Sequence, residues 1–197
     1  MQMRLNELTT AVVAPVFEQG PLFISLRELG WAQNAMPKLL MLKATALDET
    51  LVIARDTQGE TLGIASLEVR KQRFMDTAKY LKPRFLVAAI QHLIRTRIQM
   101  DALGLLNQYM KATEHGRPKV PHGYVSFIAV KPEFQGKGVG KALLLALESH
   151  AVSLSLRVIA LDTENQQNVS FYESVGFVRS GQYALNGCHI YTLQKTL

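Results

Sequence analysis

A glycine-rich turn, Gln135-Gly136-Lys137-Gly138-Val139-Gly140-Lys141, lies between an apolar run that ends at Val130 and a leucine-rich segment that starts at Ala142. Glycines at alternate positions let the backbone take unusual φ values and approach a ligand closely, with its N–H groups pointing at that ligand. The start of the following helix adds unpaired N–H groups and the positive end of the helix dipole. The sequence therefore predicts a strand, a turn and a helix that together bind an anion, and a diphosphate suits such a site.

Two common nucleotide-binding motifs do not fit this turn. A P-loop needs a glycine five positions before its Gly-Lys pair and a Ser or Thr after it, but here those positions hold Gln135 and Ala142. The dinucleotide-binding fingerprint needs glycines at its first, third and sixth positions, and counted from Gly136 the sixth is Lys141. We therefore expect neither type of site, and a flexible surface loop is the remaining alternative to a diphosphate site.

Composition is that of an ordinary folded protein. The chain has 197 residues, of which 48% are hydrophobic and 19% charged, so we expect one domain over residues 1–197. The net charge of +6 favours anionic partners, but the basic residues are spread along the chain, and we expect neither nucleic acid nor membrane as a partner. There is no apolar stretch of 18 residues and no signal-peptide pattern at Met1 to Leu5, which predicts a cytoplasmic protein.

The first half of the chain is expected to hold helices and one hairpin. Apolar residues recur at helical spacing over residues 8–16, 22–29 and 37–47. Two β-type runs, 50–56 and 61–69, are separated by a turn and predict an antiparallel hairpin.

Residues 70–118 are expected to be a helical insertion of two packed helices. Each helix is predicted from an apolar stripe, the first with Phe85, Ala88, Ala89, His92 and Leu93, the second with Leu103, Leu106, Tyr109 and Met110.

The second half alternates strands and helices, which predicts a mixed α/β fold. We expect strands at 124–130 and 156–162, parallel to each other because the helix 142–152 joins them, and a further helix over about 165–175. Leu143, Leu144 and Leu147 form the core side of the first of these helices. Asn186-Gly187 predicts a two-residue turn between closing antiparallel strands, 181–185 and 188–194. The single cysteine, Cys188, follows that turn, excludes an intramolecular disulfide and is interpreted as a structural thiol.

Two segments of this half resemble the GNAT superfamily of N-acetyltransferases. The first is the strand 124–130 followed by Pro132 and the Gln-Gly-x-Gly-x-Gly turn; the second has Asn165 seven residues before Tyr172, and then Gly176-Phe177. Residues 162–165 and 17–23 are also similar to a bacterial subgroup that includes puromycin acetyltransferase. The resemblance implies an acetyl-CoA-binding core over 124–177 and a mostly antiparallel central sheet with a parallel, splayed strand pair, flanked by helices.

In two respects the chain departs from the family pattern. The sequence shows no convincing first strand before the N-terminal helices, and about fifty residues of predicted helix separate the early hairpin from the strand 124–130. Both departures fall where acceptor substrates bind in this family, so the acceptor is not carried over from the resemblance.

The resemblance also implies which residues bind acetyl-CoA. The main chain of Ile128, Ala129 and Val130 would accept the pantetheine arm as an added strand. The diphosphate would bind the backbone N–H groups of Gln135, Gly136, Lys137, Gly138, Val139, Gly140 and Lys141. For the side chains of Lys137 and Lys141, contact with a phosphate and a solvated surface role are both open. Asn165 and Asn168 are cofactor-binding positions by the same resemblance, and for Asn165 a helix N-cap is the alternative.

Tyr172 is the expected catalytic residue. The matching tyrosine of the family lies near the thioester sulfur, where a neutral phenol can donate a proton to the departing thiolate. The alternative is an aromatic ring that only packs against Phe171 and Phe177.

The general base stays open between Glu68, His122 and Glu164, with transfer through water also open. By the resemblance, the N–H of Ile128 or Val130 would polarise the thioester carbonyl. No metal is expected, because the five histidines show no zinc-binding spacing.

The expected function is direct transfer of an acetyl group from acetyl-CoA to an amine, most simply that of a small molecule. Two alternatives stay open: acetylation of a protein or peptide amine, and a non-catalytic acyl-CoA-binding module in which 70–118 contacts a partner. The sequence also leaves open whether the chain forms a homodimer.

Overall fold

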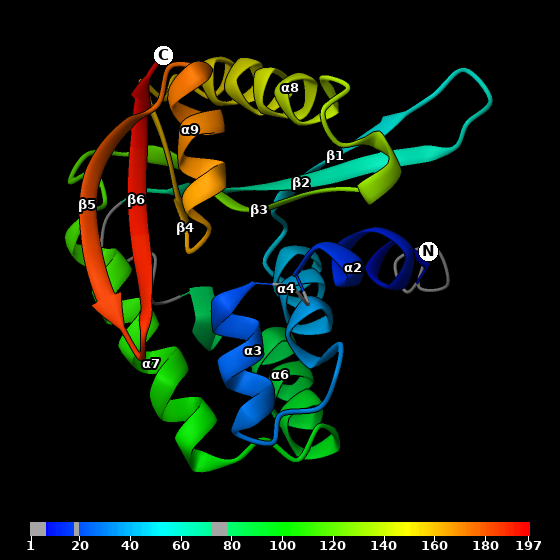
Figure 1. Ribbon diagram of the computed structural model, residues 1–197, viewed down its shortest axis with the longest axis vertical. Coiled ribbons are helices and arrows are strands. Elements are labelled where there is room, and N and C mark those ends of the chain that lie inside the picture. The colour runs from blue at the N-terminus through cyan, green and yellow to red at the C-terminus, as the bar shows by residue number, and fades with distance from the viewer. Residues whose placement is uncertain (1–6, 18–19, 72–78) are drawn as a thin grey trace.

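The structure is a computed structural model that describes residues 7–17, 20–71 and 79–197. Within these ranges a six-stranded sheet has the strand order β1-β2-β3-β4-β6-β5 (Figure 1). Its strands are β1 Thr50–Arg55, β2 Thr61–Arg70, β3 His122–Val130, β4 Val158–Thr163, β5 Val178–Leu185 and β6 Cys188–Thr196.

Strand pairing confirms the expected mixed sheet. β1 and β2 form the predicted antiparallel hairpin, and β2 with β3, β4 with β6, and β5 with β6 are antiparallel as well. β3 and β4 form a parallel pair. The crossover between them contains α8 Val139–Ser153, because the chain has to return to the end of the sheet at which β3 began before it can form a parallel strand.

Helices cover both faces of the sheet. α8 and α9 Gln166–Ser174 lie on one face, and the N-terminal helices and the insertion lie toward the other (Figure 1). The remaining helical elements are η1 Thr9–Val13, α2 Ala14–Phe17, α3 Pro21–Glu28, α4 Ala35–Ala46, η2 Lys79–Leu81, α6 Pro83–Arg95, α7 Met100–His115 and η3 Pro132–Phe134. The first strand among the described residues is therefore β1, which follows the N-terminal helices.

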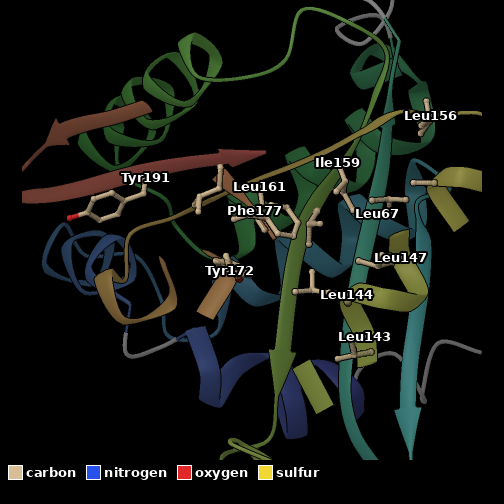
Figure 2. Packing of buried hydrophobic residues seen from close by; sticks show 14 of the residues in the cluster. Leu67, Leu143, Leu144, Leu147, Leu156, Ile159, Leu161, Tyr172, Phe177 and Tyr191 are labelled. Carbon is tan, nitrogen blue, oxygen red and sulfur yellow. The ribbon is translucent and has the colours of Figure 1, made fainter. Parts of the chain in front are cut away.

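The largest apolar cluster lies between the sheet and the α8–α9 face (Figure 2). Leu143, Leu144 and Leu147 of α8 are at most 1% exposed, which confirms their prediction as core residues. Removing a leucine side chain from water contributes about 1.5–3 kcal/mol. This packing fixes α8, and therefore the position of its N-terminus, on the sheet.

α8 begins three residues earlier than the sequence suggested. Gly138 is its N-cap with φ 83°, so Val139, Gly140 and Lys141 form the first helical turn and not part of the preceding loop. The expected start at Ala142 was wrong. Glycines lower the helix propensity of this turn, but the αL conformation of Gly138 and the packing of α8 on the sheet make it helical.

The insertion differs from the predicted pair of packed helices. Residues 72–78 lie outside the described residues, and β2 continues to Arg70. α6 packs mainly on α4 and α7 mainly on β5 and β6, so each helix has its main contacts elsewhere.

The two predicted stripes of the insertion fare differently. In α6 all five stripe residues are half-buried, while Val87, Ile90 and Ile94 are 54–71% exposed. In α7 the buried residues are Ala102, Leu105 and Thr113, whereas Met110 is 57% exposed. Leu106 and Tyr109 of the predicted stripe pack on the same apolar cluster as Ala102 and Leu105, so the prediction for α7 was correct in part and wrong for Met110.

The closing hairpin has the predicted turn. Asn186 and Gly187 both have positive φ, 47° and 80°, as a two-residue turn of this type requires. The Cys188 thiol is partly buried and donates to the carbonyl of Leu185 at 3.0 Å, in keeping with a structural thiol.

Candidate active site

The two parallel strands diverge almost as soon as they meet. β3 and β4 are paired only at Gly123 with Ile159 and at Tyr124 with Ala160. Beyond these pairs β3 continues to Val130 against β2 alone, with a β-bulge opposite Ser66 and Leu67. Ile128, Ala129 and Val130 therefore lie on a strand edge that faces β4 but pairs with no strand among the described residues. Such an edge can accept an extended ligand through main-chain hydrogen bonds.

The glycine turn begins at the end of this open edge. The side-chain amide of Gln135 donates to the carbonyl of Val130 at 3.1 Å and holds the turn against the strand. Gly136 and Gly138 have φ of 72° and 83°, and no atom lies within 4 Å of the Cβ that either residue lacks. The backbone of the turn is thus exposed and free of neighbouring side chains at two glycines, as an anion-binding turn requires.

The third glycine lies beside α9. A Cβ on Gly140 would lie 3.4 Å from the Phe171 ring, which is an ordinary van der Waals contact. Val139, Gly140 and Lys141 occupy the first turn of α8, where N–H groups lack helical partners. The side chains of Lys137 and Lys141 are exposed, and the Lys137 ammonium lies 5.4 Å from the centre of the Phe134 ring.

Asn165 and Asn168 lie at the start of α9. The Asn165 side chain accepts a hydrogen bond from the N–H of Gln167 at 2.9 Å and is the N-cap of the helix. Asn168 is exposed in the first turn of α9. The capping role of Asn165 is therefore present without any ligand, and a cofactor contact would be additional to it.

Tyr172 is buried on α9, 5% exposed, and its ring packs edge-on against Phe177 (Figure 2). The Phe171 ring packs against Tyr172 in a tilted arrangement. Burial, together with the negative charges of Asp162 and Glu164, raises the pKa of the Tyr172 phenol above its usual value. The Tyr172 ring therefore packs against its aromatic neighbours, as the alternative interpretation expects. Its hydroxyl also lies close enough to Asp162 and Glu164 for their charges to raise its pKa. A phenol in this setting stays protonated at neutral pH and is a proton donor.

The opposite face of the sheet carries buried polar groups at the point where the strands diverge. Ile159 and Leu161 of β4 face the apolar cluster, so Asp162 faces the other way. Asp162 accepts hydrogen bonds from the hydroxyls of Tyr109 and Tyr124, and its carboxylate lies 3.5 Å from the Arg117 guanidinium. Burial and the charge of Asp162 raise the pKa of both phenols, which stay neutral donors.

A second group of charges continues along β2 on the same face. The ammonium of Lys43 lies 2.8 Å from Glu68 and 2.9 Å from Glu49. Arg70 pairs with Glu68 at 3.0 Å, and its guanidinium stacks 3.9 Å from the centre of the Tyr124 ring. Arg70 thereby joins the two groups. We call the combined set the polar layer: Lys43, Glu49, Ser66, Glu68, Arg70, Tyr109, Arg117, Tyr124, Asp162 and Glu164.

The three candidate bases occupy different parts of this arrangement. Glu68 is 3% exposed and is held by Lys43 and Arg70, so it is stabilised as a carboxylate. His122 lies at the start of β3, before the strands diverge, with Nδ1 2.7 Å from the carbonyl of Val120. Glu164 follows β4 directly, at the open end, and burial together with the charge of Asp162 raises its pKa to about 7.

Sequence reasoning missed most of the polar layer. Lys43, Tyr109, Arg117 and Tyr124 come from four separate parts of the chain, and no motif connects them. One signal was available for Asp162, because a carboxylate directly after the apolar run Val158 to Leu161 of a strand requires buried partners.

Among the described residues no group of three or more His, Cys, Asp and Glu is arranged to hold a metal ion. None of the helices in the described ranges is both long and apolar enough to cross a membrane.

Comparison with known proteins matches the sequence that forms this site to one family. The model of the Acetyltransferase (GNAT) family matches residues 48–177, which is more than half of the chain and includes β3, the glycine turn and α9. This family match does not test the weaker resemblance of residues 162–165 and 17–23 to the subgroup that includes puromycin acetyltransferase. Residues 18 and 19 lie outside the described residues.

Curated relatives match the chain over part of its length. A mycothiol acetyltransferase of Propionibacterium freudenreichii is 44% identical over 68 residues, 34% of this chain and 21% of that protein. The N-alpha-acetyltransferase RimI of Mycobacterium tuberculosis is 31% identical over 96 residues, 47% of this chain and 60% of that protein. The chain therefore spans less than two thirds of either relative.

A solved structure with the same fold matches the whole chain. Arylalkylamine N-acetyltransferase 2 of Aedes aegypti superimposes with a TM-score of 0.70, covering 100% of this chain and 95% of the other, at 12% identity. At this identity the likeness concerns the fold alone, and it includes the helices outside the region that the family model matches.

Proposed function

This chain belongs to the GNAT acetyltransferase family, and from that premise we propose that it transfers an acetyl group from acetyl-CoA directly to an amine, with a small-molecule amine as the acceptor. The observation that carries the proposal is the combination of an unpaired β3 edge with an open glycine turn at its end. The acceptors of the named relatives differ, so the relatives favour amine acetylation without selecting one acceptor.

The residues present fit acetyl-CoA. The main chain of Ile128, Ala129 and Val130 would hold the pantetheine arm, since this edge has no strand partner among the described residues. The N–H groups from Gln135 to Lys141 would hold the diphosphate, because Gly136 and Gly138 leave the backbone uncovered and α8 directs its N-terminus at the same place. Lys137 and Lys141 are exposed and add positive charge to the turn, and Asn165 and Asn168, exposed at the start of α9, are proposed as further cofactor contacts.

When bound, acetyl-CoA supplies the acetyl group as a thioester whose sulfur leaves as CoA thiol. Tyr172 is proposed to give its phenolic proton to that sulfur as the bond to the acyl carbon breaks. Its raised pKa supports this role, because the hydroxyl carries its proton throughout the neutral pH range. The N–H of Ile128 or Val130 is proposed to bind the acyl oxygen.

The first test measures thiol release from acetyl-CoA with phenethylamine, spermidine, glucosamine and a peptide with a free N-terminus. We expect at least one amine to give release well above the rate without acceptor. In a parallel thermal-shift measurement, acetyl-CoA at a hundredfold excess over Kd should stabilise the protein by about 2.7 kcal/mol. Stabilisation without thiol release from any acceptor would favour the non-catalytic acyl-CoA-binding module.

The second test replaces Tyr172 by Phe, which keeps the packed ring and removes only the hydroxyl. We expect kcat to fall by about 10- to 100-fold while the affinity for acetyl-CoA stays within about twofold. Phe171→Leu on the same helix is the control for general packing effects. Equal kcat in the Tyr172→Phe protein and the wild type would remove Tyr172 from the chemistry.

One relative favours a peptide acceptor as the second candidate function. The M. tuberculosis N-alpha-acetyltransferase RimI matches 96 residues of this chain, more than the mycothiol acetyltransferase does. The peptide in the first test addresses this candidate, because a peptide acceptor should then exceed every small amine in kcat/KM.

A further inference from the structure

The charges of the polar layer balance except at one residue. Lys43, Arg70 and Arg117 are its three cations, and the carboxylates that they contact are Glu49, Glu68 and Asp162. Glu164 is a fourth carboxylate, and no Lys, Arg or His among the described residues forms an ion pair with it. A partly buried carboxylate without a cation gains stability by taking up a proton or by binding a cationic ligand.

The neighbours of Glu164 offset only part of this cost. Hydrogen bonds with Tyr109 and with the backbone of Glu164 itself favour the charged carboxylate, but burial and the charge of Asp162 outweigh them and raise the pKa. The Tyr109 hydroxyl also donates to Asp162, so its proton is shared between two carboxylates. Asp162 differs from Glu164, because two hydroxyls and Arg117 stabilise its charged form.

The position of Glu164 relates it to Tyr172. Glu164 directly follows the last residue of β4, at the end where β3 and β4 have separated, and its charge acts on the Tyr109 phenol, which donates to Asp162 on the polar face. Tyr172 approaches from α9 on the other face, and its phenol responds to the charges of both Asp162 and Glu164. The two groups therefore approach the gap between the strands from opposite faces of the sheet.

We propose that Glu164 is the general base of this site, which takes a proton from the cationic acceptor before the attack on the thioester. The proposal rests on the acetyl transfer proposed above and names a catalytic residue for it. Glu68 and His122 are set aside on geometry, since two cations hold Glu68 and His122 lies before the strands diverge.

The proton balance of the transfer is complete with these residues. The ammonium gives one proton to the Glu164 carboxylate, and the free amine nitrogen forms a bond to the acyl carbon while the bond from that carbon to sulfur breaks. Tyr172 protonates the sulfur and recovers a proton from the same nitrogen, directly or through water. Glu164 finally releases its proton to solvent, so that one amine cation and one thioester give one amide, one thiol and one proton.

The environment of Glu164 supports a base that works near neutrality. The titratable groups that interact electrostatically with it are Asp162 on β4, Tyr109 on α7, Tyr172 on α9 and the Cys188 thiol on β6. Burial and the charge of Asp162 raise the pKa of Glu164 to about 7, where a general base is both available and strong.

The test compares wild type and Glu164→Gln, which removes the base but keeps the side-chain shape. Thiol release is measured from pH 5 to 9 with the best amine of the panel above. A second acceptor is an alkoxyamine, whose nitrogen is unprotonated at pH 7. The control is Glu173→Gln, which makes the same charge change at an exposed position of α9.

For the protonated amine we expect Glu164→Gln to lower kcat about 100-fold or more at pH 7 and to abolish the inflection of the wild-type profile near that pH. For the alkoxyamine the loss should stay below about threefold, because no proton has to be removed before attack. Acetyl-CoA should stabilise both proteins equally in the thermal-shift measurement.

Two other results would distinguish failure of the role of Glu164 from failure of the proposed function. A Glu164→Gln protein with wild-type kcat and pH profile, or an equal loss with both acceptors, would overturn the role of Glu164 while acetyl transfer stands. A wild type that acetylates no amine of the panel would instead overturn the proposed function itself.

Discussion

The face of the sheet that α8 and α9 cover and the face that carries the polar layer are held together in different ways. On the first face Leu143, Leu144 and Leu147 pack into one apolar cluster, to which each side chain adds its own burial. On the second face Asp162 satisfies three partners at once, and Arg70 links two groups of charges. A loss on the apolar face should therefore be gradual, whereas a loss on the polar face leaves several buried groups unpaired.

The largest effect on the polar face is expected for Asp162→Ala. The change leaves Arg117 without its carboxylate and removes the acceptor of the Tyr109 and Tyr124 hydroxyls. We expect the free energy of unfolding to fall by about 3–5 kcal/mol, measured by urea denaturation. The control is Glu173→Ala, which breaks an exposed pair with Arg179 and should cost less than about 1 kcal/mol. Equal effects of the two changes would mean that the polar layer is no more cooperative than the surface.

On the apolar face the matching change is Leu147→Ala. Leu147 is fully buried, so its truncation should lower the free energy of unfolding by about 3 kcal/mol through lost burial and the cavity that remains. Leu145→Ala on the same helix, at a side chain that is 50% exposed, should stay within about 0.5 kcal/mol. If Leu147→Ala also changed the pH profile of thiol release, the two faces would not be independent.

A pH titration of stability tests the polar face alone. The pKa of Glu164 is raised from 4.5 to about 7, so between these values the folded protein binds a proton that the unfolded chain releases. The stabilisation is complete below about pH 4.5 and is lost as the pH rises through 7, by up to about 3 kcal/mol. Urea denaturation at several pH values, as the difference between wild type and Glu164→Gln, isolates this contribution. A difference that does not vary with pH would contradict the environment described for Glu164.

The smallest expected effect concerns the glycine turn. Gly138→Ala forces a Cβ into an αL conformation and should cost about 1–2 kcal/mol of stability. Gly59→Ala, at φ 86° in the turn between β1 and β2, should cost the same, because both sites are otherwise open. Only Gly138→Ala should also weaken acetyl-CoA binding, measured by calorimetry, since it alone changes the backbone of the proposed diphosphate site. Equal affinities in the two variants would remove Gly138 from that site.

How much of the molecule the sequence predicted depends on whether the signal was local. The hairpins and the parallel pair around α8 were predicted correctly, because alternation, turn residues and helical spacing act within short segments. The inner face of α7 was predicted only in part: Leu106 and Tyr109 pack inward as expected, but Met110 is exposed, and the hydrogen bond from Tyr109 to Asp162 on β4 joins residues far apart in the chain. In the site, the glycine turn and the α9 motif were visible, whereas the partners of Asp162 were not.

By itself the sequence determined the strand, glycine turn and helix that identify the family, since their geometry depends on residues close together in the chain. Only the tertiary structure decided which of three candidate bases lacks a counter-charge. Glu68, His122 and Glu164 are equally plausible as isolated residues, but charge compensation depends on which cations the fold places beside each carboxylate. Lys43 and Arg70 contact Glu68, Arg117 contacts Asp162, and Glu164 is left at the open end of the strands without a cation among the described residues.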